Sequence, residues 1–511
     1  MLRIPVLVFN QELNPDESQM ITQAMTLIID PVFWRSVDGT TGGPLDSYLL
    51  ILPHWLGLPF DFIRARLVGL GCILLSVWFF YRSAEVWFGQ RVARLALLPP
   101  LLLLSITQNP DFVHYSSEHL PVALLGALYL AVAVIQRSEK PTYGWVFLAG
   151  LLAGTVPFAK LQGVPMAFVA GLFILITIGF RKNLTGRQKG SRLLTLVAGS
   201  VFFPLFVVML TLLNGVFDDF ITFYIVGNFQ YGTGGDFNWL KNLAVLSHLV
   251  QRLPEFYLLV GLPVLLGLVM LPAWLKSHFK AEADWEPGAF VIVLLAATVL
   301  AVTRTGSGYP HHMLFAVIPC ALVGSWMLAT CLRYLPTAGP NHLIRSSVAV
   351  ITLLSFTLPF LFKLVKGESF NRYVQGSREL VRSDVAKFIL QYARPGEPLV
   401  VWGWMCRYYV EAQMPQGVNE NHSIRSAYDH PLKHIYLTRY VGDLTRSFPP
   451  VFVDAVGYSF WLNDRQRYAH EHFPALHTFI QTHYRFAGEI DKTRIYVRAD
   501  RFKPARQLAQ K

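Results

Sequence analysis

Residues 193–213 have the sequence LLTLVAGSVFFPLFVVMLTLL, which contains no charged side chain. A helix needs about 20 apolar residues to cross the hydrocarbon core of a bilayer, so this run is long enough for one span. Comparable runs recur along the chain up to residue 364, and we expect about ten spans in all. They lie at residues 64–88, 93–107, 119–136, 145–160, 163–180, 193–213, 254–275, 288–303, 312–332 and 346–363. The sequence therefore predicts a polytopic α-helical membrane protein.

The composition agrees with this class. Hydrophobic residues make up 53% of the chain and charged residues 15%, which is far from the balance of a soluble protein. The net charge of +12 could indicate a nucleic-acid partner, but the basic residues lie mostly in short loops between apolar runs, so we expect no nucleic acid. The cysteines are far apart in the sequence, which favours neither a disulfide framework nor a zinc site. They are Cys72, Cys320, Cys331 and Cys406.

The loops predict the orientation in the plasma (inner) membrane. One set of alternate loops is rich in Lys and Arg, for example Arg181, Lys182 and Arg187, whereas the other set is poor in them. Basic loops are retained in the cytoplasm. The first extracytoplasmic segment, at about 10–61, and the tail after residue 366 then share the outer face.

The tail has a different pattern from the rest of the chain. From residue 367 to residue 511 the apolar runs shorten and charged and turn residues return, which predicts a small soluble α/β domain beside a membrane domain at 1–366. We expect helices at 377–393 and 474–484, strands at 398–402 and 451–456, and a hairpin at 485–498.

Two adjacent acids, Asp16 and Glu17, lie in the first extracytoplasmic segment. Neighbouring residues of a regular element point in different directions, so the two cannot be assumed to act as a paired dyad. One carboxylate could serve as a general base while the other orients or caps a helix. The alternative for Asp16 is an N-cap of a helix at 17–29, and a cap does not exclude catalysis.

The second outer loop contains Asp111, His114 and Glu118. If this stretch is helical, His114 and Glu118 share one face, a spacing suited to a divalent cation or to an imidazole oriented by a carboxylate. The sequence offers no third ligand, and the competing interpretation is a polar cap on the helix 119–136. Glu118 is costly to bury at the start of a span without a function.

Two basic positions lie on the same face. Lys160 ends the run 145–160, and Arg304 precedes a glycine-rich turn that leads through Tyr309 to His312. Cations at helix edges near the acyl boundary could bind a lipid phosphate. Snorkelling is the competing explanation for Lys160.

The order of these motifs resembles the GT-C superfamily of integral membrane glycosyltransferases. The resemblance is closest to the bacterial branch that is similar to protein O-mannosyltransferases and to the lipid A aminoarabinose transferase, and it covers roughly residues 10–335. It rests on the outer Asp16-Glu17 pair, the acid Glu118 that opens a span, Lys160, and the basic-Gly-x-x-His-His loop that ends at His312.

The resemblance implies transfer of a sugar from a polyprenyl-phosphate donor to a hydroxyl of a lipid, glycan or protein on the outer face, with inversion. Asp16 matches the general base of the family, Glu17 is its neighbour in that motif, and Glu118 occupies the place of a second acid, where Asp is commoner. Lys160, Arg304 and His312 would neutralise the donor phosphate, which is the leaving group. A divalent cation stays open as a cofactor, and Asp111, His114 and Tyr309 are candidate supporting residues.

The chain departs from the family pattern at its start. A complete transmembrane helix precedes the Asp-Glu motif in the family, whereas only residues 1–10 precede it here. We expect an eleventh span if coding sequence upstream restores this helix, and an incomplete donor groove if it does not.

Other function classes stay open. A transporter or flippase of lipid-linked envelope precursors would usually place ionisable residues near the midplane of its spans, whereas the charged clusters here lie at one face. A noncatalytic partner in envelope assembly is a further class. In the tail, Trp404 could stack on a sugar of the acceptor, although core packing also explains an aromatic residue there.

Overall fold

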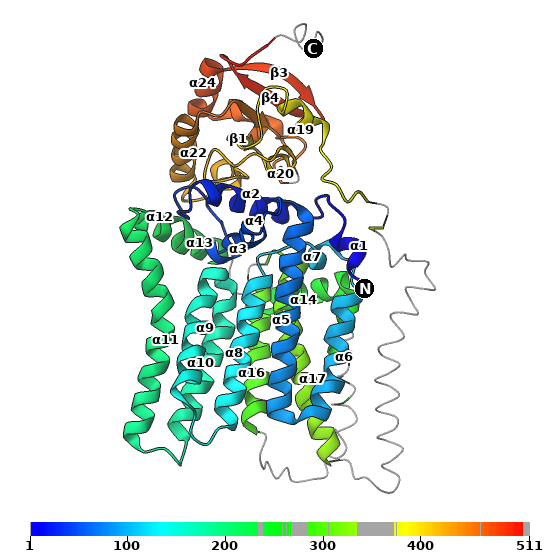
Figure 1. The fold of residues 1–511 in the computed structure, drawn as a ribbon, viewed down its shortest axis with the longest axis vertical. Helices are drawn as coiled ribbons and strands as arrows, with labels where there is room; N and C mark the ends of the chain where they lie inside the picture. The colour runs from blue at the N-terminus through cyan, green and yellow to red at the C-terminus, as the bar shows by residue number, and fades with distance from the viewer. Residues whose placement is uncertain are drawn as a thin grey trace.

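The computed structural model describes residues 2–233, 239–266, 285–304, 306–334, 373–459 and 461–503, apart from residues 258, 262, 265 and 375. Figure 1 shows long helices standing side by side, a tail with a small sheet at one end, and the N-terminal segment between them. Three predicted features lie outside the described residues. They are the span at 346–363, the part of the span at 254–275 that follows residue 266, and the domain boundary at 366.

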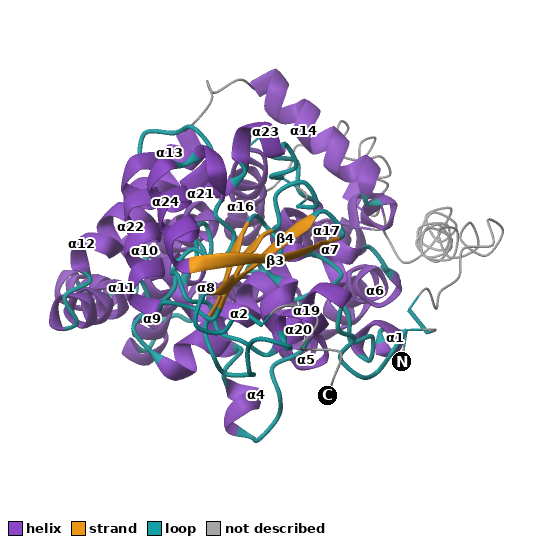
Figure 2. Ribbon diagram, turned by 90° about the horizontal axis from the view of Figure 1, so that it is seen from above, coloured by secondary structure: helices purple, strands orange, loops and turns teal. Residues whose placement is uncertain are grey.

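The long helices form one bundle. They are α5 (Phe62–Phe88), α6 (Gln90–Ile106), α8 (His119–Arg137), α9 (Tyr143–Ala159), α10 (Val164–Phe180), α11 (Gly186–Leu213), α16 (Trp285–Thr303) and α17 (Leu314–Tyr334), whereas α14 (Trp239–Arg252) lies crosswise to them (Figure 2). Within the described residues, six helical stretches are long and apolar enough to cross a membrane, and α9 is a shorter apolar helix. The predicted polytopic helical class is confirmed, while the number of spans stays a prediction.

Helices α9 and α11 approach each other closely because glycines line their contact. A Cβ atom on Gly154 would lie 2.1 Å from the Ser200 carbonyl oxygen, and one on Gly150 would lie 2.3 Å from that of Leu196. On α11, a Cβ on Gly199 would lie 2.4 Å from the Phe147 oxygen. Small residues at a helix contact let the backbones meet in this way. The glycines of α9 and α11 therefore serve close helix packing.

The remaining elements of this part of the chain lie at the end of the bundle that faces the tail (Figure 1). They are α1 (Ile4–Leu7), α2 (Pro15–Ile29), α3 (Pro44–Leu49), α4 (Leu52–Trp55), α7 (Pro110–Val113), η1 (Leu161–Gly163), α12 (Phe217–Asp219), η2 (Phe220–Val226), α13 (Gly227–Thr233), η3 (Pro254–Phe256) and η4 (Pro310–Met313). The expectation that Asp16 caps α2 is wrong. Asn14 is the N-cap, and its side chain accepts a hydrogen bond from the Asp16 backbone N–H at 3.0 Å. The Asp16 side chain is thus left available for other contacts.

The described part of the tail contains a four-stranded mixed sheet in the order β1-β2-β4-β3. Its strands are β1 (Leu399–Trp402), β2 (Val451–Asp454), β3 (Tyr484–Ile490) and β4 (Thr493–Arg498), with β1 parallel to β2 and the other pairs antiparallel. These strands lie where the sequence predicted them. The helices are α19 (Asp384–Ile389), α20 (Arg407–Ala412), α21 (Ile424–Ala427), α22 (Lys433–Ser447), α23 (Arg465–Tyr468), η5 (His470–His472) and α24 (Pro474–His483).

The first tail helix is shorter than predicted. The expected helix at 377–393 begins only after Ser383, whose side chain accepts a hydrogen bond from the Ala386 backbone N–H and caps α19. The preceding residues instead reach the N-terminal segment, where Asn10 donates its side-chain amide to the Arg378 carbonyl at 3.2 Å. Contacts with the N-terminal segment thus take the place of the first two predicted turns of this helix.

The tail is fixed on α2 by hydrogen bonds. The Gln416 backbone N–H donates to the Thr26 hydroxyl at 3.1 Å, and the Asn421 side-chain amide donates to the Gln19 carbonyl at 3.0 Å. Seen from above, the sheet lies over the region of α2, α8 and α20 (Figure 2). This docking places the loops around Trp404 and α21 over the outer end of the bundle.

Candidate active site

A cavity of about 1570 Å³ lies between the bundle and the tail. Residues from α2, the loop 39–43, α3, α7, the end of α9, α16, the loop 304–312 and the tail line it. Of the predicted site residues, the structure brings seven to its wall: Asp16, Asp111, Lys160, Arg304, Tyr309, His312 and Trp404. Glu17, His114 and Glu118 lie behind this wall.

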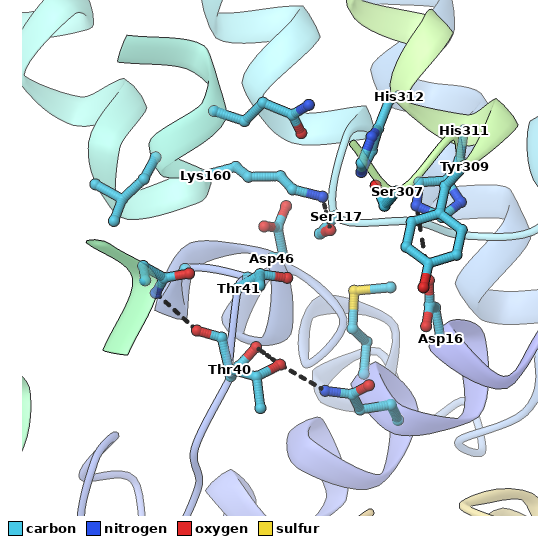
Figure 3. Close-up of a pocket in the computed structure, with 18 of the residues that line it drawn as sticks. Asp16, Thr40, Thr41, Asp46, Ser117, Lys160, Ser307, Tyr309, His311 and His312 are labelled. Atoms are coloured by element: carbon cyan, nitrogen blue, oxygen red, sulfur yellow. Dashed lines mark hydrogen bonds and ion pairs between the residues drawn. The ribbon is translucent and has the colours of Figure 1, made fainter. Parts of the chain in front are cut away.

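His311 lies at the centre of an acidic cluster. Its Nε2 lies 3.9 Å from the Asp16 carboxylate and 4.0 Å from that of Glu118, and its Nδ1 lies 3.6 Å from the carboxylate of Asp111. Tyr309 stacks on the imidazole with ring centroids 5.4 Å apart (Figure 3). His312 was the histidine predicted from this motif, whereas the structure places His311 at the centre of the cluster; both side chains are buried.

Lys160 and Glu118 form a buried ion pair. The Lys160 ammonium also donates to the Ser117 hydroxyl at 2.8 Å. It reaches this position because α9 ends at Ala159 and the extended backbone of Lys160 forms an isolated β-bridge with Gly42. The side chain therefore points into the protein, which excludes snorkelling as its explanation.

The charges of this pair follow from its contacts. Burial alone would raise the pKa of Glu118, but Lys160 and the nearby histidines outweigh burial and lower it. Glu118 is therefore a carboxylate that keeps a cation at the cavity wall. One of its oxygens, Oε2, has no hydrogen-bond partner among the described residues.

Asp16 reaches the cavity, and its surroundings disfavour the charged form of its carboxyl group. Its side chain is 30% exposed and faces His311 (Figure 3). Burial raises the pKa of Asp16, and the neighbouring Glu118 adds to this, while His311 and Lys160 oppose it. A carboxylate that is destabilised in this way binds a proton more readily than an exposed Asp, as a general base must.

Asp111 differs from Asp16, although both contact His311. Burial raises the pKa of Asp111, but the interaction with the nearby His311 ring outweighs burial and lowers it. The Asn14 side-chain amide also donates to its carboxylate at 2.7 Å. Asp111 is therefore an ionised partner that orients His311.

Glu17 points away from the cavity. Arg66 donates to both of its carboxylate oxygens, from Nε at 2.9 Å and from Nη2 at 2.7 Å, and the Tyr115 backbone N–H donates at 3.1 Å. Both side chains of the pair are fully buried. The two adjacent acids thus diverge as the sequence predicted, and Glu17 joins α2 to α5.

The expectation that His114 and Glu118 share a helical face is wrong. Helix α7 ends at Val113 and α8 begins at His119, so residues 114–118 are not helical. His114 instead contacts the Pro110 carbonyl through Nδ1 at 2.7 Å, and burial lowers its pKa to about 3. A pattern based on helical spacing failed here because Asn109 and Pro110 begin a single separate turn.

Two groups of side chains at this site could hold a metal ion. The ligand atoms of Asp16, His114 and His311 lie within 4.8 Å of one another, as do those of Glu118, His311 and His312. The unpartnered oxygen of Glu118 and the unpartnered Nδ1 of His312 fit this interpretation. Oxygen and imidazole donors suit a divalent cation such as Mn²⁺ or Zn²⁺.

The tail closes the cavity with aromatic and basic residues. Trp404 lies beside His422 with ring centroids 5.2 Å apart, and Arg425, Tyr428 and Trp461 also line the cavity. Of these residues, the sequence predicted only Trp404 as a site residue. His422, Arg425, Tyr428 and Trp461 have no sequence pattern that predicts such a role, because only the docking of the tail on α2 brings them to the cavity.

The fold is similar to that of solved membrane proteins. The chain is similar over 98% of its length to ArnT from Cupriavidus metallidurans bound to undecaprenyl phosphate, with 14% identity, 97% of that chain covered and a TM-score of 0.59. Its similarity to the apo form of that protein gives 13% identity, the same coverage and a TM-score of 0.57.

The predicted resemblance to GT-C proteins is thereby confirmed for the fold. The archaeal oligosaccharyltransferase AglB from Archaeoglobus fulgidus matches less well, with 11% identity, 97% and 71% of the two chains covered and a TM-score of 0.42. No protein-family model and no curated protein matches the sequence.

Proposed function

We propose that the protein is an integral membrane glycosyltransferase that moves a sugar from a polyprenyl-phosphate donor to an acceptor hydroxyl on the outer face of the plasma membrane. The observation that carries this proposal is the cavity in which a destabilised carboxylate, Asp16, faces the same space as Lys160 and Arg304. An acceptor base and phosphate-binding cations are the two requirements of this reaction.

The donor phosphate would bind at the bundle side of the cavity. Lys160, Arg304 and His312 line it there, and the apolar residues Leu161, Pro165, Ile225, Leu300 and Ala301 continue the same wall. A charged headgroup at the cations and an isoprenoid chain along the apolar residues match a lipid phosphate. The ArnT structure, which contains undecaprenyl phosphate, has the same fold.

In the reaction, Asp16 would take the proton of the acceptor hydroxyl as its oxygen attacks the anomeric carbon. The bond from that carbon to the phosphate oxygen breaks, and the phosphate leaves with the electron pair. Lys160 and Arg304 would stabilise the charge on the departing phosphate. A direct displacement of this kind inverts the anomeric configuration.

A divalent cation, held by Glu118, His311 and His312, would add positive charge for the phosphate. Asp111 would orient His311, and Glu118 would keep Lys160 at the cavity wall. The acceptor would enter beneath the tail, where Trp404 and Arg425 line the cavity.

The test uses the purified full-length protein in lipid vesicles. Wild type should transfer label from undecaprenyl-phosphate-linked sugars to an acceptor extract, and Asp16→Asn should not. Asp30→Asn, at the exposed end of the same helix, is the matched control and should keep full transfer. Full transfer by Asp16→Asn would contradict the assigned base, and absence of transfer by wild type with every donor would contradict the function.

A further inference from the structure

One wall of the cavity is polar and almost uncharged. Its side chains are amides and hydroxyls around a single acid: Gln19, Gln23, Thr40, Thr41, Asp46, Ser47 and Asn228. In Figure 3, Asp46 and Thr41 lie on one side of the Lys160 ammonium, whereas His311, Tyr309 and Asp16 lie on the other. The acid–imidazole cluster and this polar wall are therefore separate parts of one cavity.

Two amide side chains of the wall are held by neighbouring hydroxyl and backbone groups. Ser47 donates its hydroxyl to the Gln23 side-chain oxygen at 2.6 Å, and Gln23 donates its amide to the Asp38 carbonyl at 3.1 Å. Asn228 donates its amide to the Thr40 carbonyl at 2.8 Å. A wall with side chains fixed in this way presents hydrogen-bonding groups without a large entropic cost on binding.

Asp46 is the exception in this network. It is 1% exposed and lines the cavity, yet neither carboxyl oxygen has a hydrogen-bond partner among the described residues. A buried polar group without a partner costs free energy, so such a group in a folded protein calls for an explanation. Burial also raises the pKa of Asp46 well above its usual value.

The backbone forces Asp46 into this place. Gly43 donates its N–H to the Ala159 carbonyl at 2.7 Å, and a Cβ atom on Gly43 would lie 2.0 Å from the Phe158 oxygen. Tyr115 then donates its hydroxyl to the Asp46 carbonyl at 2.9 Å. With both contacts fixed, the Asp46 side chain is held in the cavity wall on one side of the Lys160 ammonium (Figure 3).

We propose that Asp46 and the polar wall bind the transferred sugar of the donor, with the Asp46 carboxyl holding a sugar hydroxyl. This inference rests on the proposed function, because Lys160 must hold the donor phosphate. A phosphate at Lys160 has the acid–imidazole cluster on one side and the polar wall on the other. Hydroxyl groups need partners that both donate and accept, which the amides and hydroxyls supply, and the Asp46 carboxyl adds acceptor oxygens.

The same wall indicates the class of sugar. Its described side chains include no Arg or Lys apart from Lys160, which is occupied by Glu118 and would serve the phosphate. A sugar acid would bring a carboxylate beside Asp46 without a cation to neutralise it. We therefore infer that the transferred sugar carries no carboxylate.

The experiment compares lipid ligands that differ in the sugar alone. Binding of undecaprenyl phosphate, undecaprenyl-phosphate glucose, undecaprenyl-phosphate mannose and undecaprenyl-phosphate arabinose is measured on the full-length protein in detergent. Wild type should bind at least one sugar-linked lipid about tenfold more tightly than the bare lipid, as a few net hydrogen bonds predict. Asp46→Leu should remove this gain, and Asp46→Asn should remove part of it.

Bare undecaprenyl phosphate should bind wild type and both variants within about twofold, which also shows that the variants are folded. Gln19→Leu provides a second, independent change in the wall and should likewise reduce the gain, whereas Asp30→Asn should not. Equal binding of bare and sugar-linked lipids by wild type, or an unchanged gain in Asp46→Leu, would overturn the inference. Failure of wild type to bind bare undecaprenyl phosphate would instead count against the proposed function.

Discussion

Replacing Glu17 with Gln separates the structural acid of the Asp16-Glu17 pair from the chemical one. The substitution leaves the Arg66 guanidinium buried without its anionic partner, because both side chains are fully buried. Removing one member of a buried pair typically costs about 3–5 kcal/mol. Arg66 also donates to the Val6 and Gln11 carbonyls, so part of the N-terminal segment depends on the same side chain.

The assay is reversible unfolding of the purified protein in mixed detergent micelles, followed by circular dichroism. Glu17→Gln should lower the free energy of unfolding by about 3 kcal/mol, and Asp16→Asn should change it by less than about 1 kcal/mol. Adding Arg66→Met to Glu17→Gln should recover part of the loss, because the unpaired charge is then removed.

Activity gives the second readout of this comparison. Glu17→Gln should keep measurable transfer at a temperature where it is folded, whereas Asp16→Asn should not. Loss of transfer in Glu17→Gln with an unchanged free energy of unfolding would refute the structural assignment of Glu17.

Three further predictions concern the phosphate, the base and the helix contact. Lys160→Met should raise the dissociation constant of undecaprenyl phosphate about tenfold to a hundredfold, and the exposed control Lys182→Met should leave it unchanged, as measured by ligand titration. The acid limb of kcat/KM should lie above pH 3.8, because the carboxylate of Asp16 is the active form and burial raises its pKa above that value. Activity should be lost as the pH falls through the raised pKa of Asp16, and an acid limb at or below pH 3.8 would contradict the prediction. Gly154→Leu should lower the free energy of unfolding by about 1–3 kcal/mol or more, whereas Gly171→Leu, whose Cβ would meet nothing within 4 Å, should have little effect.

Much of the fold was predictable because local pattern determines it. The apolar runs that became α5, α8, α10 and α11 lie within a few residues of the predicted spans, since a bilayer requires a long uninterrupted apolar helix. The strands of the tail were equally clear. The helix at 377–393 was overestimated because its first residues contact the N-terminal segment, and the sequence carries no local signal of that contact.

The site was predictable in part. The position of charged residues on one face selected Asp16, Asp111, Lys160 and Arg304, and all of them line the cavity. The role of Glu17 was not accessible, because Arg66 lies 49 residues away and meets it only in the folded bundle. Asp46 was missed for a similar reason, since its burial depends on the contact of Gly43 with the end of α9.

The most direct test of the central claim is single-turnover transfer by protein already saturated with undecaprenyl-phosphate sugar. Asp16→Asn should bind this donor within about threefold of wild type while its transfer rate falls by about 10²–10⁴-fold, since it removes the base and leaves the phosphate site intact. A transfer rate equal to that of wild type, or a lost rate explained entirely by lost donor binding, would contradict the role of Asp16 and with it the proposed reaction in this cavity.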